Sequence, residues 1–310
     1  MNIPKLIFEK IPSLPSLRAR DFTGFWATDS GKCSRDLFWK VTGEPTSDPM
    51  DFKGHVNTSL GSIAEQVFIR RWLSKLGVYG LHVIDEQVAV GGTDPAWQGY
   101  VDIIVAYKDG NEWVKEAIEF KTSWGRGADF LYDQRSPKDD HMMQIGLYLK
   151  DFADKGIPIT RGNLVYLLVS SNPDVTGLVL SFPVYYKDGI VTCDTMLSPN
   201  GETRIKPVKK DINKVLAKFK KVLEAAANKK CPPPDFQYKY PLTPDVLEKT
   251  KDWSLKAAIE GRKILGDFQP QYSSYKKKAL ELDGVSQQYT DEEKAILRAE
   301  YRKRHPKSKI

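Results

Sequence analysis

Two carboxylates and a lysine carry the clearest chemical signal in the sequence. Asp102 lies in the largely apolar segment 99–104, and Glu119 and Lys121 end the segment 117–121. Positions two apart on a strand point to the same side, so Glu119 and Lys121 share a face, and a hairpin would bring Asp102 beside them. Burying carboxylates among Val, Ile and Phe is costly without a partner such as Mg²⁺, which binds one or two carboxylates plus water and phosphate oxygens. With Lys121 near the attacking water or the scissile phosphate, the expected chemistry is metal-assisted phosphodiester hydrolysis.

Apolar periodicity predicts the elements that must position these residues. Residues 57–76 carry apolar side chains at helical spacing and are followed by Gly77. The turn signal at 108–111 joins two strand-like runs as a hairpin. The expected elements are helices over 57–76, 139–152, 211–228, 243–265 and 291–304, strands over 81–90, 100–107, 113–120, 163–170 and 178–186, and a polar loop over 122–138. This order predicts an α/β (α+β) core, a sheet flanked by helices, with a basic helical extension.

The order Asp102, then Glu119-Phe120-Lys121, on consecutive strands after a helix resembles the signature of the PD-(D/E)XK nucleases. Two further segments resemble elements of the RecB-type and lambda-exonuclease-type branches. The segment 61–65 resembles G-x-x-x-(H/E), with Glu65 where many members have His, and the segment 144–148 matches Q-x-x-x-Y. The resemblance implies a restriction-endonuclease-like core with a mixed central β-sheet.

The resemblance also implies a role for each candidate site residue. The oxygen ligands of one or two Mg²⁺ or Mn²⁺ ions would come from Glu65, Asp102, Glu119 and the carbonyl of Phe120. The catalytic residues would be Asp102, Glu119 and Lys121, with Lys121 orienting or activating water. The substrate strand would be positioned by Gln144 and Tyr148, and Trp124 and Arg126 would line its path through stacking and phosphate contact.

The segment 32–43 resembles the N-terminal part of the RecB-like nucleases of CRISPR adaptation. In those proteins its cysteine joins three others near the C-terminus to hold an iron–sulfur cluster. This chain has only Cys33, Cys193 and Cys231, widely spaced. Three thiolates cannot supply a four-cysteine site, so no iron–sulfur cluster is expected. The odd cysteine count also gives no disulfide framework and favours a reducing compartment.

Targeting signals are missing from the sequence pattern. Residues 1–20 have no continuous signal-peptide core, and no run reaches the ~18 apolar residues of a membrane span. The expected location is therefore the cytoplasm of a bacterial or virus-infected host cell, with no secretion and no membrane partner.

The positive charge is concentrated in the last third of the chain. The 310 residues carry a net charge of +7, but residues 1–199 hold 21 Lys+Arg against 25 Asp+Glu, whereas 200–310 hold 26 against 15. Repeated lysine clusters in this last part suit a phosphate backbone. The expected division is an N-terminal segment 1–30, a nuclease domain 31–235 and a basic helical extension 236–310.

The leading expectation is an Mg²⁺- or Mn²⁺-dependent exonuclease that acts on DNA ends or single strands, in recombination, repair or viral DNA processing. Two alternatives remain: a non-catalytic DNA-binding or recombination partner of the same fold, and a structure- or site-specific endonuclease. The sequence has no G-x-x-x-x-G-K-[ST] loop, so it does not unwind DNA by its own ATP hydrolysis. Beyond DNA, the expected partners are a helicase, a recombinase or a single-strand-binding protein.

Overall fold

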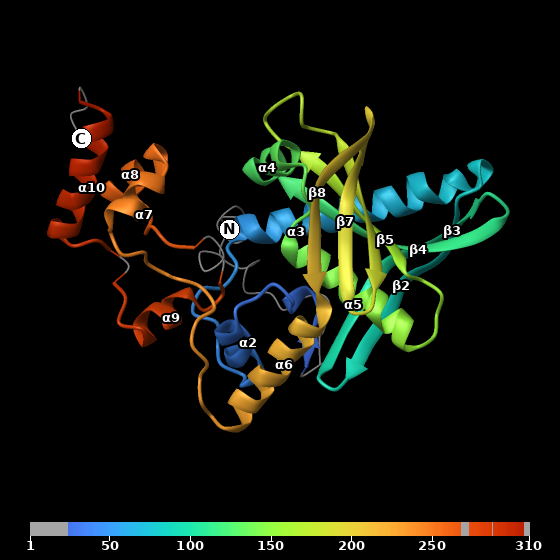
Figure 1. Cartoon of the computed structure of the whole chain (residues 1–310), viewed down its shortest axis with the longest axis horizontal. Helices are drawn as coiled ribbons and strands as arrows, with labels where there is room; N and C mark the ends of the chain where they lie inside the picture. The colour runs from blue at the N-terminus through green and yellow to red at the C-terminus, as the bar shows by residue number, and fades with distance from the viewer. Residues whose placement is uncertain (1–23, 268–272, 287, 307–310) are drawn as a thin grey trace, which may run out of the picture. The chain divides into compact units, whose positions relative to one another are not determined.

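The computed structural model describes residues 24–267, 273–286 and 288–306, which form two compact units (Figure 1). We call them the sheet unit (Met1–Lys32 and Met50–Glu224) and the helical unit (Cys33–Pro49 and Ala225–Ile310). Of the expected N-terminal segment 1–30, residues 1–23 lie outside the described residues. The division at 30 and 235 stays a prediction.

An eight-stranded mixed sheet forms the centre of the sheet unit. Its strands are β1 (Phe25–Trp26), β2 (His82–Thr93), β3 (Ala96–Asp109), β4 (Glu112–Trp124), β5 (Arg161–Val169), β6 (Val179–Lys187), β7 (Ile190–Ser198) and β8 (Gly201–Asp211). They are ordered β1-β3-β4-β5-β6-β7-β8, with β2 paired to β3. The pairs β1·β3 and β4·β5 are parallel and the others antiparallel.

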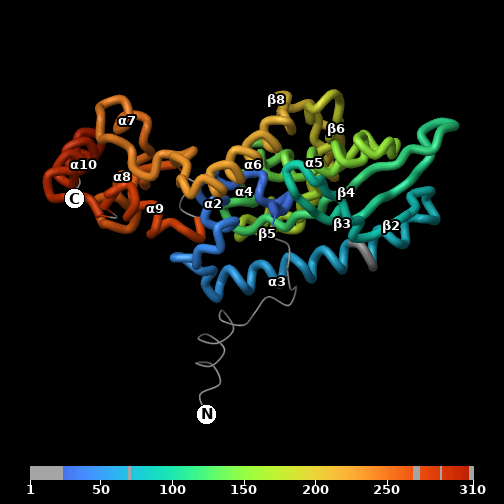
Figure 2. The backbone as a smooth tube through the Cα atoms, turned by 90° about the horizontal axis from the view of Figure 1, so that it is seen from below, coloured from blue at the N-terminus to red at the C-terminus, as the bar shows by residue number. Residues whose placement is uncertain are grey.

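Helices cover both faces of this sheet. The helical segments of the unit are η2 (Ala27–Asp29), α3 (Phe52–Val67), η3 (Phe68–Trp72), η4 (Leu73–Tyr79), α4 (Arg126–Gln134), α5 (Asp139–Asp154) and α6 (Ile212–Ala227). Phe68 stacks on Phe120 of β4, with ring centroids 4.5 Å apart, whereas Gln144 of α5 bonds to Glu119. Adjacent residues of a strand point to opposite faces, so η3 with α3 and α5 lie on opposite sides of β4 (Figure 2).

The helical unit has its own apolar core. Its helices are α2 (Ser34–Val41), α7 (Pro244–Lys249), α8 (Asp252–Ile259), α9 (Lys276–Leu282) and α10 (Asp291–Arg304). Leu247, Leu255 and Leu297, from α7, α8 and α10, are buried in one cluster. Thr290 and Glu293 form a capping box that begins α10. No helix among the described residues is long and apolar enough to cross a membrane.

The predicted fold class is confirmed. The sheet is mixed and flanked by helices, in the order helix, three strands, helix, strand. The helices expected over 139–152, 211–228 and 291–304 correspond to α5, α6 and α10.

Four local predictions were wrong or incomplete. The helix expected over 57–76 is α3, which begins at Phe52 and ends at Val67 before a π turn. The polar loop over 122–138 contains α4. The span 243–265 divides into α7 and α8 because Thr250 is extended, with its hydroxyl donating to the Val246 carbonyl. Finally, β7 and β8 were not predicted; in β8 the exposed side chains of Arg204, Lys206 and Lys209 obscure the strand pattern.

Candidate active site

The candidate site lies where β3 separates from β4. The two strands pair from Asp109↔Glu112 to Ile103↔Ile118, and further along β3 the partner is β1. Where the strands separate, a hydrogen bond to a side chain takes the place of backbone pairing between β3 and β4. The backbone N–H of Phe120 donates to Oδ2 of Asp102 over 2.8 Å. The hairpin therefore brings Asp102 beside Glu119, as its spacing required.

Glu119 is the buried centre of this group, with 2 % of its surface exposed. Its Oε1 accepts hydrogen bonds from the Lys121 ammonium and from Nε2 of Gln144, the latter at 2.5 Å. Its Oε2 is buried and has no hydrogen-bond partner among the described residues. Burial and the nearby charge of Asp102 raise the pKa of Glu119 to about 8, although Lys121 opposes the shift.

Lys121 remains a cation in this environment. Burial alone would lower its pKa, but the charges of Glu119 and Asp102 outweigh burial and raise it overall. The ammonium thus stays positive beside the carboxylates, where it can hold an anionic substrate group or a nucleophilic water.

Helix α5 contributes Gln144 and Tyr148, one turn apart on the same face. Nε2 of Gln144 also donates to the Tyr148 hydroxyl over 2.6 Å. Both side chains are buried, and burial together with the Glu119 charge raises the pKa of Tyr148 well above its usual value. Gly99 of β3 allows this close approach, since a Cβ there would lie 2.7 Å from Cε1 of Tyr148.

Glu65, near the end of α3, reaches the site through a residue that the sequence did not indicate. Nε2 of Gln87 on β2 lies 3.2 Å from Oε1 of Glu65 and 3.4 Å from Oδ1 of Asp102. Gln87 has φ of +53°, a left-handed conformation in the middle of a strand. The register of β2 against β3 is the feature that points to Gln87. Glu86 pairs with Ile103 and Val88 pairs with Val101, so Gln87 lies opposite Asp102.

Trp124 and Arg126 are placed differently from the other candidates. Trp124 shares the strand face of Phe120 and not that of Glu119, by the alternation of β4. Arg126 is exposed at the first position of α4. The structure therefore gathers Glu65, Asp102, Glu119, Lys121, Gln144 and Tyr148 at one place, and sets Trp124 and Arg126 beyond it.

The donor set fits a hard divalent cation. Carboxylate oxygens are the ligands that Mg²⁺ and Mn²⁺ prefer, and the buried, unpartnered Oε2 of Glu119 is an acceptor that a cation would satisfy. As the side chains stand, no three His, Cys, Asp or Glu residues within the described ranges are grouped closely enough to hold a metal. Gln87 lies between Glu65 and Asp102, and Lys121 is bonded to Glu119.

The three cysteines are divided between the two units. Cys193 is buried in β7 of the sheet unit, and Cys33 and Cys231 belong to the helical unit. The absence of an iron–sulfur cluster stays a prediction.

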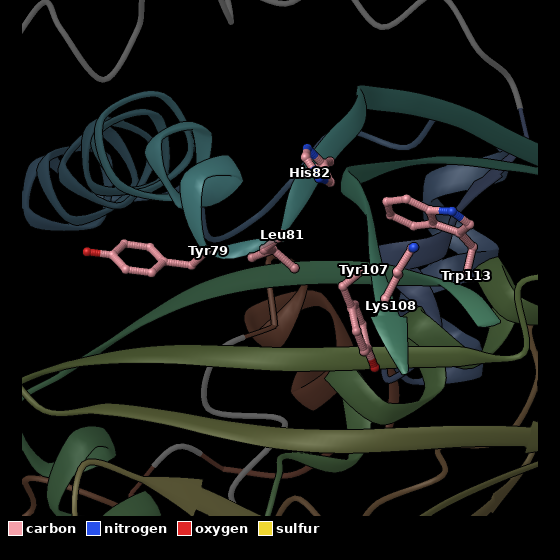
Figure 3. A pocket seen from close by; sticks show the side chains of 7 residues that line it. Tyr79, Leu81, His82, Tyr107, Lys108 and Trp113 are labelled. Carbon is pink, nitrogen blue, oxygen red and sulfur yellow. The ribbon is translucent and has the colours of Figure 1, made fainter. Parts of the chain in front are cut away.

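A hollow of about 690 Å³ lies at the far end of the β3–β4 hairpin and not at the carboxylates. Its lining includes Tyr79, Leu81, His82, Tyr107, Lys108 and Trp113 (Figure 3). Trp113 is six residues from Glu119 along β4, or roughly 20 Å. This hollow is separate from the candidate site.

Comparison with known proteins gives distant structural neighbours only. No protein-family model and no curated protein matches the chain. The chain is similar to the crystal structure of an alkaline exonuclease, LHK-Exo, from Laribacter hongkongensis, with 14% identity and a TM-score of 0.38 over 67% of this chain and 89% of that chain. The complex of LHK-Exo with dAMP matches over the same shares with 14% identity and a TM-score of 0.37. The function is therefore inferred from the residues of the site.

Proposed function

We propose that the chain is a metal-dependent deoxyribonuclease of the PD-(D/E)XK type, acting as an exonuclease on DNA ends or single strands. One observation carries the proposal. Asp102, Glu119 and Lys121 meet at the separation of β3 and β4, and the central carboxylate is buried with one oxygen unpartnered. Burial of such a group is costly unless a ligand satisfies it. The motif resemblance in Glu65, Gln144 and Tyr148 supports the same assignment.

The roles follow from the surroundings of each residue. Glu65, Asp102, Glu119 and the Phe120 carbonyl would hold Mg²⁺ or Mn²⁺, which supplies positive charge that acidifies water and stabilises charge on a phosphate. Lys121 holds a proton and orients the water or the scissile phosphate. Gln144 fixes Oε1 of Glu119, and Tyr148 fixes Gln144.

Residues outside this group have supporting roles in the proposal. Gln87 positions the carboxylates of Glu65 and Asp102 through its amide. Arg126, exposed at the start of α4, contacts the strand beyond the carboxylates, whereas Trp124 lies on the strand face opposite Glu119 and has no role in the proposal. In this proposal the chain acts in the cytoplasm, in recombination, repair or viral DNA processing. It works there together with a helicase, a recombinase or a single-strand-binding protein.

The test is digestion of end-labelled single- and double-stranded DNA in Mg²⁺ and in Mn²⁺, with EDTA as the metal-free control. We expect cleavage that depends on free ends and is lost in EDTA and in Lys121→Ala. Retained turnover by Lys121→Ala would contradict the mechanism, and cleavage of closed circular DNA would favour an endonuclease. Metal-independent DNA binding without cleavage by the wild-type chain would favour the non-catalytic alternative.

A further inference from the structure

A buried hydroxyl without a partner lies beyond the carboxylates on β4. Ser123 is 3 % exposed, and its Oγ has no hydrogen-bond partner among the described residues. Ser123 is two residues after Lys121, so the two side chains share a strand face. A hydroxyl buried in this way costs free energy unless an acceptor reaches it.

The hydroxyl faces the start of α4. This helix of nine residues begins directly after β4, and its N-cap residue, Gly125, supplies no side-chain cap. A Cβ at Gly127, the second helical residue, would lie 3.2 Å from Ser123 Oγ and 3.9 Å from Lys138 Nζ. In α4 the N–H groups of Ala128 and Asp129 already donate to the Gly125 carbonyl, so the open end of the helix is its start at Gly127, where the backbone carries partial positive charge. Hydroxyl, ammonium and helix end therefore converge on one place.

Lys138 supplies the positive charge at this place. It is half-buried, and burial lowers its pKa; Asp140 opposes that shift and Lys121 adds to it. Among the described residues no ion pair joins Lys138 to Asp140. Lys121 is already paired with Glu119, and Asp129 in the first turn of α4 accepts a hydrogen bond from the Ser170 hydroxyl. His141 lies near both lysines, and burial with their charges keeps its pKa well below the usual value, so its ring stays neutral. The ammonium of Lys138 is therefore the charge that can hold an anion here.

We propose that Ser123, Lys138 and the first turn of α4 form a subsite for a backbone phosphate of a nucleic-acid strand. Ser123 is four residues after Glu119, about 13 Å along β4. The phosphate held there therefore belongs to another linkage of the strand than the one at the carboxylates, and not to the directly adjacent one. The ligand class, a phosphodiester, follows from the donors themselves, all of which donate to an anion. The inference rests on the proposed function in placing the scissile linkage of that strand at Glu119.

The test compares Ser123→Ala and Lys138→Gln with Lys115→Gln, which removes an exposed lysine from the same strand. The probe is a fluorescein-labelled single strand of about 20 nucleotides, longer than one binding site, measured by anisotropy in EDTA across a salt series. We expect about tenfold weaker binding for Ser123→Ala and Lys138→Gln. Lys138→Gln should also lower the slope of log K against log salt by about 0.7. Ser123→Ala should melt no lower than the wild type, because it removes an unsatisfied buried donor.

Equal binding by Ser123→Ala, Lys138→Gln and Lys115→Gln would overturn the subsite. Cleavage by the wild type is measured separately. A wild type that cleaves while the variants bind normally refutes the subsite alone. Weakened binding by the variants of a wild type that does not cleave supports the subsite and refutes the proposed catalysis.

Discussion

Gln144 of α5 donates a hydrogen bond to the buried carboxylate of Glu119 over 2.5 Å and, through the same nitrogen, to the Tyr148 hydroxyl over 2.6 Å. The helix thereby holds the central carboxylate of the sheet in one orientation. Because Lys121 uses the same Oε1 of Glu119, the other oxygen is left for a ligand.

Replacing Gln144 with Met should release this carboxylate while keeping the side-chain volume. We expect the free energy of unfolding to fall by about 1–3 kcal/mol, the range for leaving a buried polar group unsatisfied, and turnover to fall by at least tenfold. Urea denaturation and a steady-state nuclease assay measure the two effects. Tyr148→Phe is the matched control, since it removes the second bond and leaves the first. Unchanged turnover in Gln144→Met would show that Glu119 needs no positioning from α5.

The Lys121–Glu119 pair should separate stability from activity in a double-mutant cycle. Lys121→Met leaves a buried carboxylate without its cation, and we expect a loss of about 1–3 kcal/mol in unfolding free energy. Glu119→Gln combined with Lys121→Met removes both charges, so the double variant should lose less than the sum of the single losses. Cleavage should be absent in all three. Additive stability losses would contradict a direct pair.

Gln87 should favour metal binding at the expense of stability. Its φ of +53° is unfavourable for a residue with a Cβ by about 1 kcal/mol. Gln87→Gly relieves that strain and removes the amide between Glu65 and Asp102. We expect stability at least equal to that of the wild type and Mn²⁺ affinity, by isothermal titration, lower by about 10–100-fold. Gln87→Asn, which tolerates this conformation but reaches less far, is the control for the amide. Wild-type Mn²⁺ affinity in Gln87→Gly would exclude the positioning role.

Glu293 should make the helical unit sensitive to acid. Burial alone would raise its pKa, but the Lys239 ammonium and the backbone N–H of Thr290 lower it overall. Because the folded pKa lies below the unfolded value of about 4.3, its stabilisation is present above that value and is lost as pH falls through the folded pKa. Glu293→Gln should therefore flatten the unfolding profile below about pH 4. An acid profile identical to that of the wild type would count against the Glu293 contribution.

The site residues that could be predicted from the sequence are those whose relative positions follow from local periodicity. The hairpin turn and the two-residue period of strands were enough to bring Asp102, Glu119 and Lys121 together, and the four-residue period of a helix aligned Gln144 with Tyr148. Gln87 escaped prediction because no local pattern signals a left-handed residue within a strand. Helix α4 escaped as well, since its surroundings are polar and glycine-rich and its first turn has no capping side chain.

The lysines and arginines of the basic C-terminal clusters have two different roles. Some form ion pairs and hydrogen bonds within the protein, and others are exposed and free to meet a charged ligand; the sequence alone could not separate the two. Within the sheet unit, Lys210 pairs with Asp139, Lys220 pairs with Asp94, and Lys218 donates to the carbonyls of Ser30 and Lys32. These lysines therefore support the fold. Charge counted along the chain therefore overstates the positive charge that is left unpaired within the protein.

The cluster at the end of α10 allows the two roles to be tested on neighbouring residues. Arg304 donates to the carbonyls of Leu247 (2.6 Å) and Thr250 (2.7 Å) at the end of α7. Arg304→Ala removes the guanidinium donor from both carbonyls and leaves that of Leu247 with the Thr250 N–H, so the helical unit should lose about 1–3 kcal/mol. Lys303 is 80% exposed, and Lys303→Gln should leave stability within about 0.5 kcal/mol while lowering the salt dependence of single-strand DNA binding by about 0.7 in log–log slope. Truncation after Asp283 cannot make this distinction, because it removes Leu297 from the core. An unchanged salt slope in Lys303→Gln would mean that this end of α10 does not contact the nucleic acid.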